Sequence, residues 1–279
     1  MKRFTTSDGL SLAYEDEGKG QPVLCLPGLT RNSRDFDLFA EQFSRDYRII
    51  RLDFRGRGES AYDENFQNYH PAVEARDVVE LLAHLGLEKT TIIGTSRGGI
   101  VAMVLAATAK QVLEGVVLVD IGPVIEREGL DEIAGYLGVT PKYKTVASAA
   151  LAASLNRQAR FPGVGADRWN WFFSNNWYDA EDGIRLRYDR KLRDAFLGAM
   201  EEAGELPDTW PLFDAFEGLP LALIHGENSD ILSQATADEM RARRPDMMYA
   251  SVPGRGHIPF LDEPECVELL RRFLGSLKK

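Results

Sequence analysis

The sequence predicts an α/β protein in which a mostly parallel sheet carries helices on both faces. Short apolar segments of strand type alternate with helical segments over most of the 279 residues, and such alternation is typical of a covered parallel sheet. Between Gly122 and about Asp208 the alternation stops, and only helix-like segments separated by Gly and Pro remain. We therefore expect a core of residues 1–121 and 209–279, with residues 122–208 forming a helical cap.

Eight segments have strand character. The first two flank Ser7-Asp8-Gly9, and Asp-Gly between extended runs predicts a hairpin. The sheet should therefore begin antiparallel and continue in parallel. The expected strands are residues 4–6, 10–14, 23–26, 48–52, 90–93, 115–119, 219–224 and 247–252.

Helical periodicity separates these strands and continues through the insert. In the core the pattern predicts helices over residues 34–43, 72–85, 100–109, 233–244 and 264–277. In the insert it predicts helices over residues 130–137, 146–155, 167–174 and 192–200, and no strand.

Composition excludes several classes of function. The net charge of −10 disfavours nucleic acid, since binding phosphates needs a basic face. The two cysteines, Cys25 and Cys266, fit neither a disulfide framework nor a metal cluster. The first residues lack the apolar core of a secretory signal, and no stretch approaches eighteen apolar residues. We expect a soluble cytoplasmic protein that binds neither nucleic acid nor membrane; the sequence does not predict its oligomeric state.

The segment GTSRGG, residues 94–99, marks the point where a predicted strand gives way to a predicted helix. Gly94, Ser96 and Gly98 fit the G-x-S-x-G turn that presents a nucleophilic serine above a sheet. Glycines are needed there because a side chain on either would collide with neighbouring backbone. The alternative is that Ser96 only caps the helix.

A serine hydroxyl becomes a good nucleophile only when a histidine takes its proton and a carboxylate orients that histidine. His257 is the best candidate base, because it lies in a loop directly after the last predicted strand, where ligands bind to parallel sheets. His84 lies within a helix, His70 precedes a proline in a polar stretch, and His225 closes an apolar strand.

Two acids could orient this histidine, because both follow predicted strands. Asp230 lies in HGENSD, between a strand and a helix, whereas Asp120 ends VVLVD at the entrance to the insert. We favour Asp230 as the triad acid. The alternative for each is a capping or turn role.

Attack on an ester carbonyl places negative charge on oxygen, which preformed N–H donors must meet. The backbone N–H groups of Arg97 and Leu29 are the expected donors, and Gly28 allows the Leu29 loop to approach closely. The Arg97 side chain is unfavourable at a helix N-terminus. We expect it to form an ion pair with an acid such as Asp120 or Glu227; the alternative is a clamp for a substrate carboxylate.

With this order of nucleophile, acid and histidine, the chain resembles the α/β-hydrolase family over nearly its whole length, and most closely lidded bacterial serine esterases and enol-lactonases. The segments LPGLT, LDFRGRGES and GRGHIPFLDEP carry the resemblance together with GTSRGG. It implies an eight-stranded, mostly parallel sheet with a helical cap after strand six, and Ser96, Asp230 and His257 as the triad. It also implies a structural turn formed by Asp53, Arg55, Gly56, Gly58 and Ser60.

Two positions depart from the family pattern. Pro27-Gly28 stands where His-Gly is common, and Thr95 precedes the nucleophile where His is frequent. Neither departure removes a backbone donor. A serine nucleophile also argues against a dehalogenase or an epoxide hydrolase.

The insert should cover the pocket, and its aromatic residues could form an apolar acyl or alcohol site. The alternative is that they pack the cap onto the core, as such residues usually do at helical spacing. The candidates are Trp169, Trp171, Phe172, Phe173, Trp177 and Tyr178, with the three tryptophans as the expected substrate contacts.

We therefore expect a serine hydrolase that cleaves a small carboxylic ester or lactone through an acyl-enzyme intermediate, without a metal or an organic cofactor. Carbon–carbon bond hydrolases of ring-cleavage products and cofactor-free perhydrolases share the fold and triad, so these activities stay open. A ligand receptor that keeps the triad is a third possibility.

Overall fold

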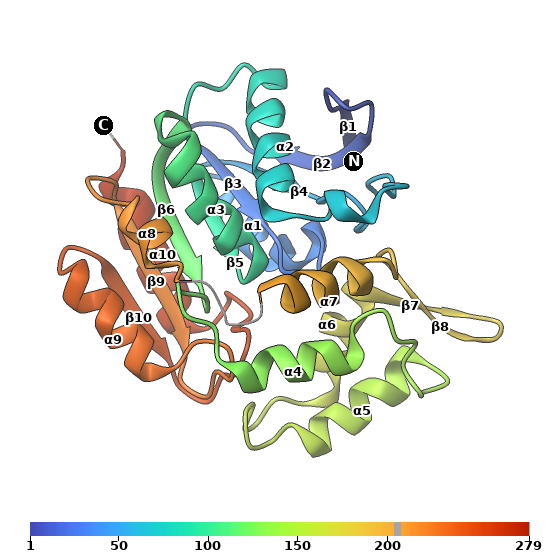
Figure 1. Ribbon diagram of the computed structural model, residues 1–279. Coiled ribbons are helices and arrows are strands. Elements are labelled where there is room, and N and C mark those ends of the chain that lie inside the picture. Colours follow the sequence, from blue (N-terminus) through green and yellow to red (C-terminus); the bar gives the residue numbers. More distant parts are fainter. Residues whose placement is uncertain (204–207, 279) are drawn as a thin grey trace.

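Eight strands form one sheet in the order β1-β2-β4-β3-β5-β6-β9-β10, seen in the computed structural model of Figure 1. The structure describes residues 1–203 and 208–278. Within the sheet β2 pairs antiparallel with both β1 and β4, and the remaining pairs are parallel. The predicted antiparallel start is therefore confirmed. The strands are β1 (Lys2–Thr5), β2 (Ser11–Glu17), β3 (Pro22–Leu26), β4 (Arg48–Leu52), β5 (Thr90–Thr95), β6 (Leu113–Val119), β9 (Leu221–Gly226) and β10 (Met248–Val252).

Alternating side chains of each central strand enter two different hydrophobic clusters. In β6, Val116 and Leu118 face a cluster shared with α2, α3, α8 and α9, whereas Val117 and Val119 face a cluster shared with α1 and α10. Burial on both faces explains why these strands are almost continuously apolar. The helices are α1 (Asp37–Phe43), α2 (Pro71–His84), α3 (Arg97–Thr108), α8 (Trp210–Asp214), α9 (Gln234–Arg243) and α10 (Pro264–Ser276), with short 3-10 turns η1 (Ser33–Phe36), η2 (Phe66–Asn68) and η3 (Lys110–Val112).

The chain between β6 and α8 forms an insert that lies beyond the carboxyl ends of β5 and β6 (Figure 1). The four helices predicted there are present. The expectation of no strand was wrong, because two strands of four residues each form an antiparallel hairpin in which Trp177 pairs with Leu186. The insert contains α4 (Arg127–Tyr136), α5 (Val146–Asn156), α6 (Ala166–Asn176), β7 (Trp177–Ala180), β8 (Gly183–Leu186) and α7 (Leu192–Ala203). Residues 204–207, near the expected end of the cap, lie outside the described residues.

The insert has its own hydrophobic cluster, built from α5, α6 and β8 and joined by Phe260 from the core. Hydrogen bonds also connect α6 to the loop after β3. Asn32 Nδ2 donates to the carbonyl of Asn175 at 2.6 Å, and Arg31 donates to the carbonyl of Phe172 at 2.8 Å. The loop after β3 is therefore fixed from both the core and the insert.

The segment after β4 forms a buried turn. Asp53 accepts hydrogen bonds from the backbone N–H groups of Ser33 and Glu59, at 2.7 and 2.8 Å. Ser60 Oγ donates to the carbonyl of Asp53 at 2.6 Å. This turn therefore connects the end of β4 to the loop after β3.

Cys25 and Cys266 are both buried and unbonded to each other. Burial raises the pKa of each thiol. Within residues 1–203 and 208–278, no helix has the length and apolar character needed to cross a membrane.

Candidate active site

Ser96 occupies a strained turn between β5 and α3. Its φ is +50°, a region that L-residues rarely adopt. A Cβ at Gly94 would lie 2.6 Å from the Gly98 carbonyl oxygen, and a Cβ at Gly98 would lie 2.1 Å from the Leu26 carbonyl oxygen. Both contacts are forbidden, so the two glycines permit the turn. The structure thus confirms the strand, turn and helix predicted around GTSRGG.

His257 contacts both Ser96 and a buried carboxylate. Its Nε2 lies 3.0 Å from Ser96 Oγ, and its Nδ1 lies 2.8 Å from Asp120 Oδ2. The loop that carries His257 packs tightly against Gly226, where a Cβ would lie 2.7 Å from the carbonyl oxygens of residues 255 and 256. Three side chains from separate loops therefore form one hydrogen-bonded series, as nucleophilic serine catalysis requires.

Asp120 is fully buried and directly follows β6. It adopts φ +53°, which turns the chain sharply at the end of the strand. Its Oδ1 accepts from the backbone N–H of Gly226 at 2.8 Å, and its Oδ2 accepts from Ser229 Oγ at 2.7 Å as well as contacting His257. The β9 loop therefore supplies hydrogen bonds that hold the carboxylate against the imidazole.

The expectation that Asp230 orients the imidazole is corrected by this geometry. Asp230 Oδ2 instead lies 2.6 Å from Arg160 Nη1, and the same guanidinium lies 2.5 Å from Glu132 of α4. Burial raises the pKa of Asp230, and the charge of Arg160 opposes that rise. Strands β6 and β9 are neighbours, so both acids reach the vicinity of His257, but only Asp120 directs its carboxylate at Nδ1.

The expected oxyanion donors lie on either side of the nucleophile. A Cβ built on Gly28 would lie 3.8 Å from Ser96 Cβ, so the loop after β3 passes beside the serine. Neither the N–H of Leu29 nor that of Arg97 has a backbone acceptor among the described residues. Their role as oxyanion donors stays a prediction.

The Arg97 side chain forms an ion pair, but with neither of the acids expected from the sequence. Its Nε lies 2.6 Å from Glu74 Oε2, and its Nη2 donates to the carbonyl of Tyr69 at 3.0 Å. Glu227 instead accepts from the N–H of Gly254. Glu74 lies in the first turn of α2, where acids are common for helix-dipole reasons, so the sequence did not distinguish it.

The aromatic residues of the insert serve mainly to pack it. Trp169 is only 1% exposed and lies within the cluster of the insert, so the expectation that it contacts substrate is not supported. Trp177 stacks on Phe173 with ring centroids 4.5 Å apart. Trp171 lines a cavity of about 10 Å³ next to Thr95, which has room for about one water molecule.

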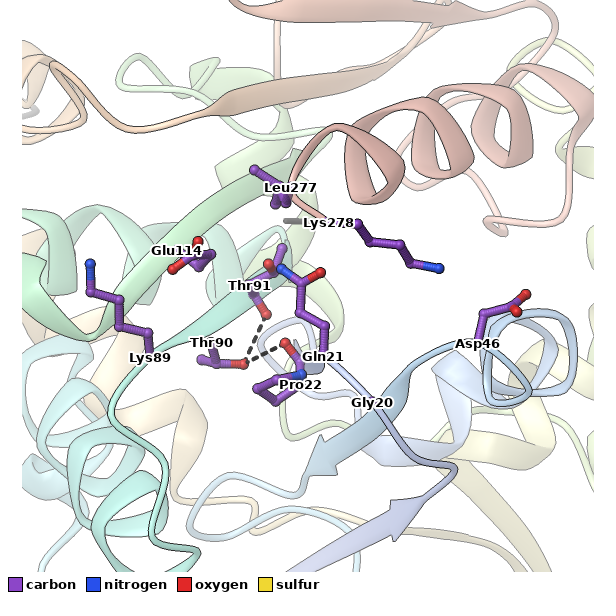
Figure 2. A pocket seen from close by; sticks show the side chains of 10 residues that line it. All are labelled: Gly20, Gln21, Pro22, Asp46, Lys89, Thr90, Thr91, Glu114, Leu277 and Lys278. Carbon is purple, nitrogen blue, oxygen red and sulfur yellow. Dashed lines mark hydrogen bonds between the residues drawn. The ribbon is translucent and has the colours of Figure 1, made fainter.

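A second cavity lies at the amino ends of the parallel strands, opposite the end that carries Ser96. It has a volume of about 480 Å³ and is lined by the starts of β3 and β5, including Pro22, Thr90 and Thr91 (Figure 2). Strand β5 separates Thr90 from Ser96 by about 20 Å at 3.3 Å per residue. This cavity is therefore remote from the triad.

No group of three or more His, Cys, Asp or Glu side chains suited to a metal ion is found in the described part of the chain.

Comparisons with known proteins agree with this geometry. Residues 23–268 match the alpha/beta hydrolase family. The chain is 32% identical over 267 residues to a 3-hydroxybutyrate-oligomer hydrolase of Cupriavidus necator, covering 93% of this chain and 90% of that protein. It is 25% identical to the esterase YbfF of Escherichia coli, covering 94% of this chain and 96% of that protein.

A solved structure of another alpha/beta hydrolase matches nearly the whole chain. The crystal structure of an alpha/beta hydrolase from Novosphingobium aromaticivorans is 38% identical to this chain, with a TM-score of 0.89. The match covers 98% of this chain and 97% of that one.

Proposed function

Because the chain belongs to the alpha/beta hydrolase family, we propose that it hydrolyses carboxylic esters or lactones through an acyl-enzyme intermediate on Ser96. The observation that carries the proposal is the hydrogen-bonded series from Ser96 Oγ through His257 to Asp120. The series supplies a nucleophile, a base and a group that orients the base.

In the acylation step, Ser96 Oγ attacks the carbonyl carbon and its proton passes to His257 Nε2. Asp120 accepts the Nδ1–H, which fixes the imidazole tautomer and stabilises the imidazolium. The carbonyl oxygen becomes an anion and takes up hydrogen bonds from the N–H groups of Leu29 and Arg97. When the intermediate collapses, the C–O bond breaks and the alcohol leaves with the proton held by His257.

Water then completes the cycle. His257 Nε2 takes a proton from water as the water oxygen attacks the acyl carbon, and the proton returns to Ser96 Oγ as the carboxylic acid is released. With a lactone substrate the alcohol and the acyl group remain in one molecule, so the product is a hydroxy acid. Neither step needs a metal or an organic cofactor.

The likeness to the Cupriavidus necator enzyme suggests which ester to test first. That relative is named a 3-hydroxybutyrate-oligomer hydrolase, and such oligomers are chains of hydroxy acids joined by ester bonds. A 3-hydroxybutyrate dimer is therefore the first ester to test, because its ester bond offers the carbonyl that Ser96 would attack.

Turnover of p-nitrophenyl butyrate, a 3-hydroxybutyrate dimer and a small lactone tests the proposal. We expect repeated turnover of at least one of the three, abolished by Ser96→Ala. A protein that cleaves none of them but cleaves a dienoic ring-fission diketone would be a carbon–carbon bond hydrolase. A single slow acylation with tight binding would indicate a receptor. Either result would contradict the proposal.

A further inference from the structure

Two arginine side chains, Arg57 from the turn after β4 and Arg97 from the first residue of α3, contact one glutamate of α2. Glu74 Oε1 lies 2.8 Å from Arg57 Nη1, and Glu74 Oε2 lies 2.6 Å from Arg97 Nε. Glu74 and Arg57 are fully buried, and the Arg97 side chain is 14% exposed. The carboxylate therefore bridges the two guanidinium groups away from solvent.

The charges of the two arginines favour the ionised form of Glu74. Burial works to raise the pKa of Glu74, but the charges of Arg97 and Arg57 outweigh burial, and the pKa is lowered. Two cations share this single anion, so the group of three carries a net positive charge. Loss of the carboxylate would leave two buried guanidinium groups facing each other without compensation.

Each arginine is connected to one of the two expected oxyanion donors. Arg57 Nε donates to the carbonyl of Leu29 at 2.8 Å, and the N–H of Leu29 is one donor. Arg97 carries the second donor on its own backbone, directly after Ser96. Glu74 is therefore linked to Leu29 through the Arg57 side chain, and it contacts the Arg97 side chain directly.

We propose that Glu74 is a positioning residue of the oxyanion hole, which fixes the distance between the Leu29 loop and the start of α3 by holding Arg57 and Arg97 together. The inference rests on the proposed function, because it assigns Leu29 and Arg97 as oxyanion donors. Glu74 does not touch the reacting atoms and acts through the two arginines. Small displacements at such a site have large effects on rate.

The same helix provides a matched control. Asp77 lies three residues after Glu74 on α2, is also fully buried and also pairs with an arginine, at 2.7 and 2.6 Å to Arg55. The side-chain contacts of Arg55 run to Asp8, Asp63 and Asp77. They do not include the Leu29 loop or the start of α3. The backbone carbonyl of Arg55 accepts from Arg57 Nη1 at 2.6 Å, and this bond does not involve the Asp77 carboxylate, so we expect removal of that carboxylate to leave the Arg57 contacts in place.

The test compares Glu74→Gln with Asp77→Asn in the full-length protein. For p-nitrophenyl butyrate we expect Glu74→Gln to lower kcat by about 10- to 100-fold, with KM little changed, since complete loss of one oxyanion donor costs about 10²–10³. Both variants should lower the Tm by similar amounts, because each removes the charge of a buried acid on α2. Asp77→Asn should nevertheless keep kcat near that of the wild type. If only the net charge mattered, Glu74→Gln should raise kcat, because the group of residues 57, 74 and 97 would become more positive and stabilise the oxyanion better.

A second measurement does not depend on turnover. A trifluoromethyl ketone adds to Ser96 Oγ to form a hemiketal whose oxygen anion occupies the oxyanion hole, while the serine proton passes to His257. We expect Glu74→Gln to weaken this inhibitor by the same factor by which it lowers kcat, and Asp77→Asn to leave its affinity unchanged. Wild-type protein that binds the ketone but cleaves no ester would refute the proposed function and still test the role of Glu74.

Arg57→Lys provides a further variant should Glu74→Gln fold poorly. A lysine keeps the charge, but its single ammonium cannot contact both the Leu29 carbonyl and Glu74 in the same way, so kcat and ketone affinity should again fall together. Equal kcat and ketone affinity in Glu74→Gln and Asp77→Asn, or a rise in KM alone, would overturn the proposal.

Discussion

The loops after β6 and β9 each present an aspartate near His257, yet the two carboxylates have different surroundings. Asp120, after β6, is fully buried and contacts the imidazole directly. Asp230, after β9, contacts Arg160, which also holds Glu132 of the insert. One acid belongs to the hydrogen-bonded series with His257 and Ser96, and the other connects the core to the insert.

Residues at the end of β9 and in the loop after it hold the aspartate that follows β6. The β9 loop does not supply the acid, but its Ser229 hydroxyl and Gly226 N–H are the hydrogen-bond donors that hold Asp120. Ser229 Oγ also accepts from the N–H groups of Ile231 and Leu232, at 3.2 and 3.1 Å. A short polar side chain at position 229 thus leaves room for a carboxylate that enters from the neighbouring strand.

The largest expected effect separates the two aspartates directly. Asp120→Asn should lower kcat by about 10³–10⁴, because the amide stabilises the wrong imidazole tautomer. Asp230→Asn should change kcat by less than about fivefold, since a partly exposed ion pair is worth up to about 1 kcal/mol. Steady-state kinetics on one ester checks both variants, and the reverse ranking would show that Asp230 is the acid.

An intermediate effect is expected at Ser229. Ser229→Ala removes one of the hydrogen bonds to Asp120 but leaves those from Gly226 and His257. Hydrogen bonds to a charged group contribute about 1.5–3 kcal/mol, so we expect kcat to fall about tenfold or more. Ser233→Ala, at the N-cap of α9, is the control and should lower only the Tm. Unchanged kcat in Ser229→Ala would show that the β9 loop does not support the acid.

The smallest effect concerns stability and depends on pH. Arg160→Met removes the cation between Asp230 and Glu132, and we expect the Tm at pH 7 to fall by about 2–4 °C, the range for about 1 kcal/mol in a protein of this size. Without Arg160, the pKa of Asp230 in the folded state should rise further above its unfolded value.

The sign of the pH dependence follows from that rise. A folded state that holds a proton more tightly than the unfolded state loses stability as pH rises through the folded pKa. Thermal melts of wild type and Arg160→Met should therefore differ least near pH 4 and most above neutral pH. A larger difference at pH 4 would contradict the assigned ion pair.

Most of the fold and two of the three residues in the hydrogen-bonded series could be predicted from sequence. The central strands β3, β6 and β9 are largely apolar and bounded by turn residues, so the sequence pattern predicted their positions. Ser96 and His257 followed because each lies directly beyond a strand, in a motif whose glycines have a steric reason. The hairpin of β7 and β8 was missed because its strands are only four residues each and form no continuous apolar run.

The choice between the acids could not be made from sequence. Asp120 and Asp230 both end strands that are neighbours in the sheet, and only side-chain direction distinguishes them. That direction depends on the φ of +53° at Asp120 and on the hydrogen bond from Ser229. Glu74 was missed for a related reason, because its partners Arg57 and Arg97 are distant in sequence.

Proton NMR of the Nδ1–H of His257 tests the central claim most directly. A proton shared between an imidazole and a buried carboxylate resonates far downfield and exchanges slowly with solvent. We expect this resonance in the wild type and in Asp230→Asn, and its loss in Asp120→Asn. A resonance that persists in Asp120→Asn and disappears in Asp230→Asn would show that Asp230, not Asp120, orients the imidazole.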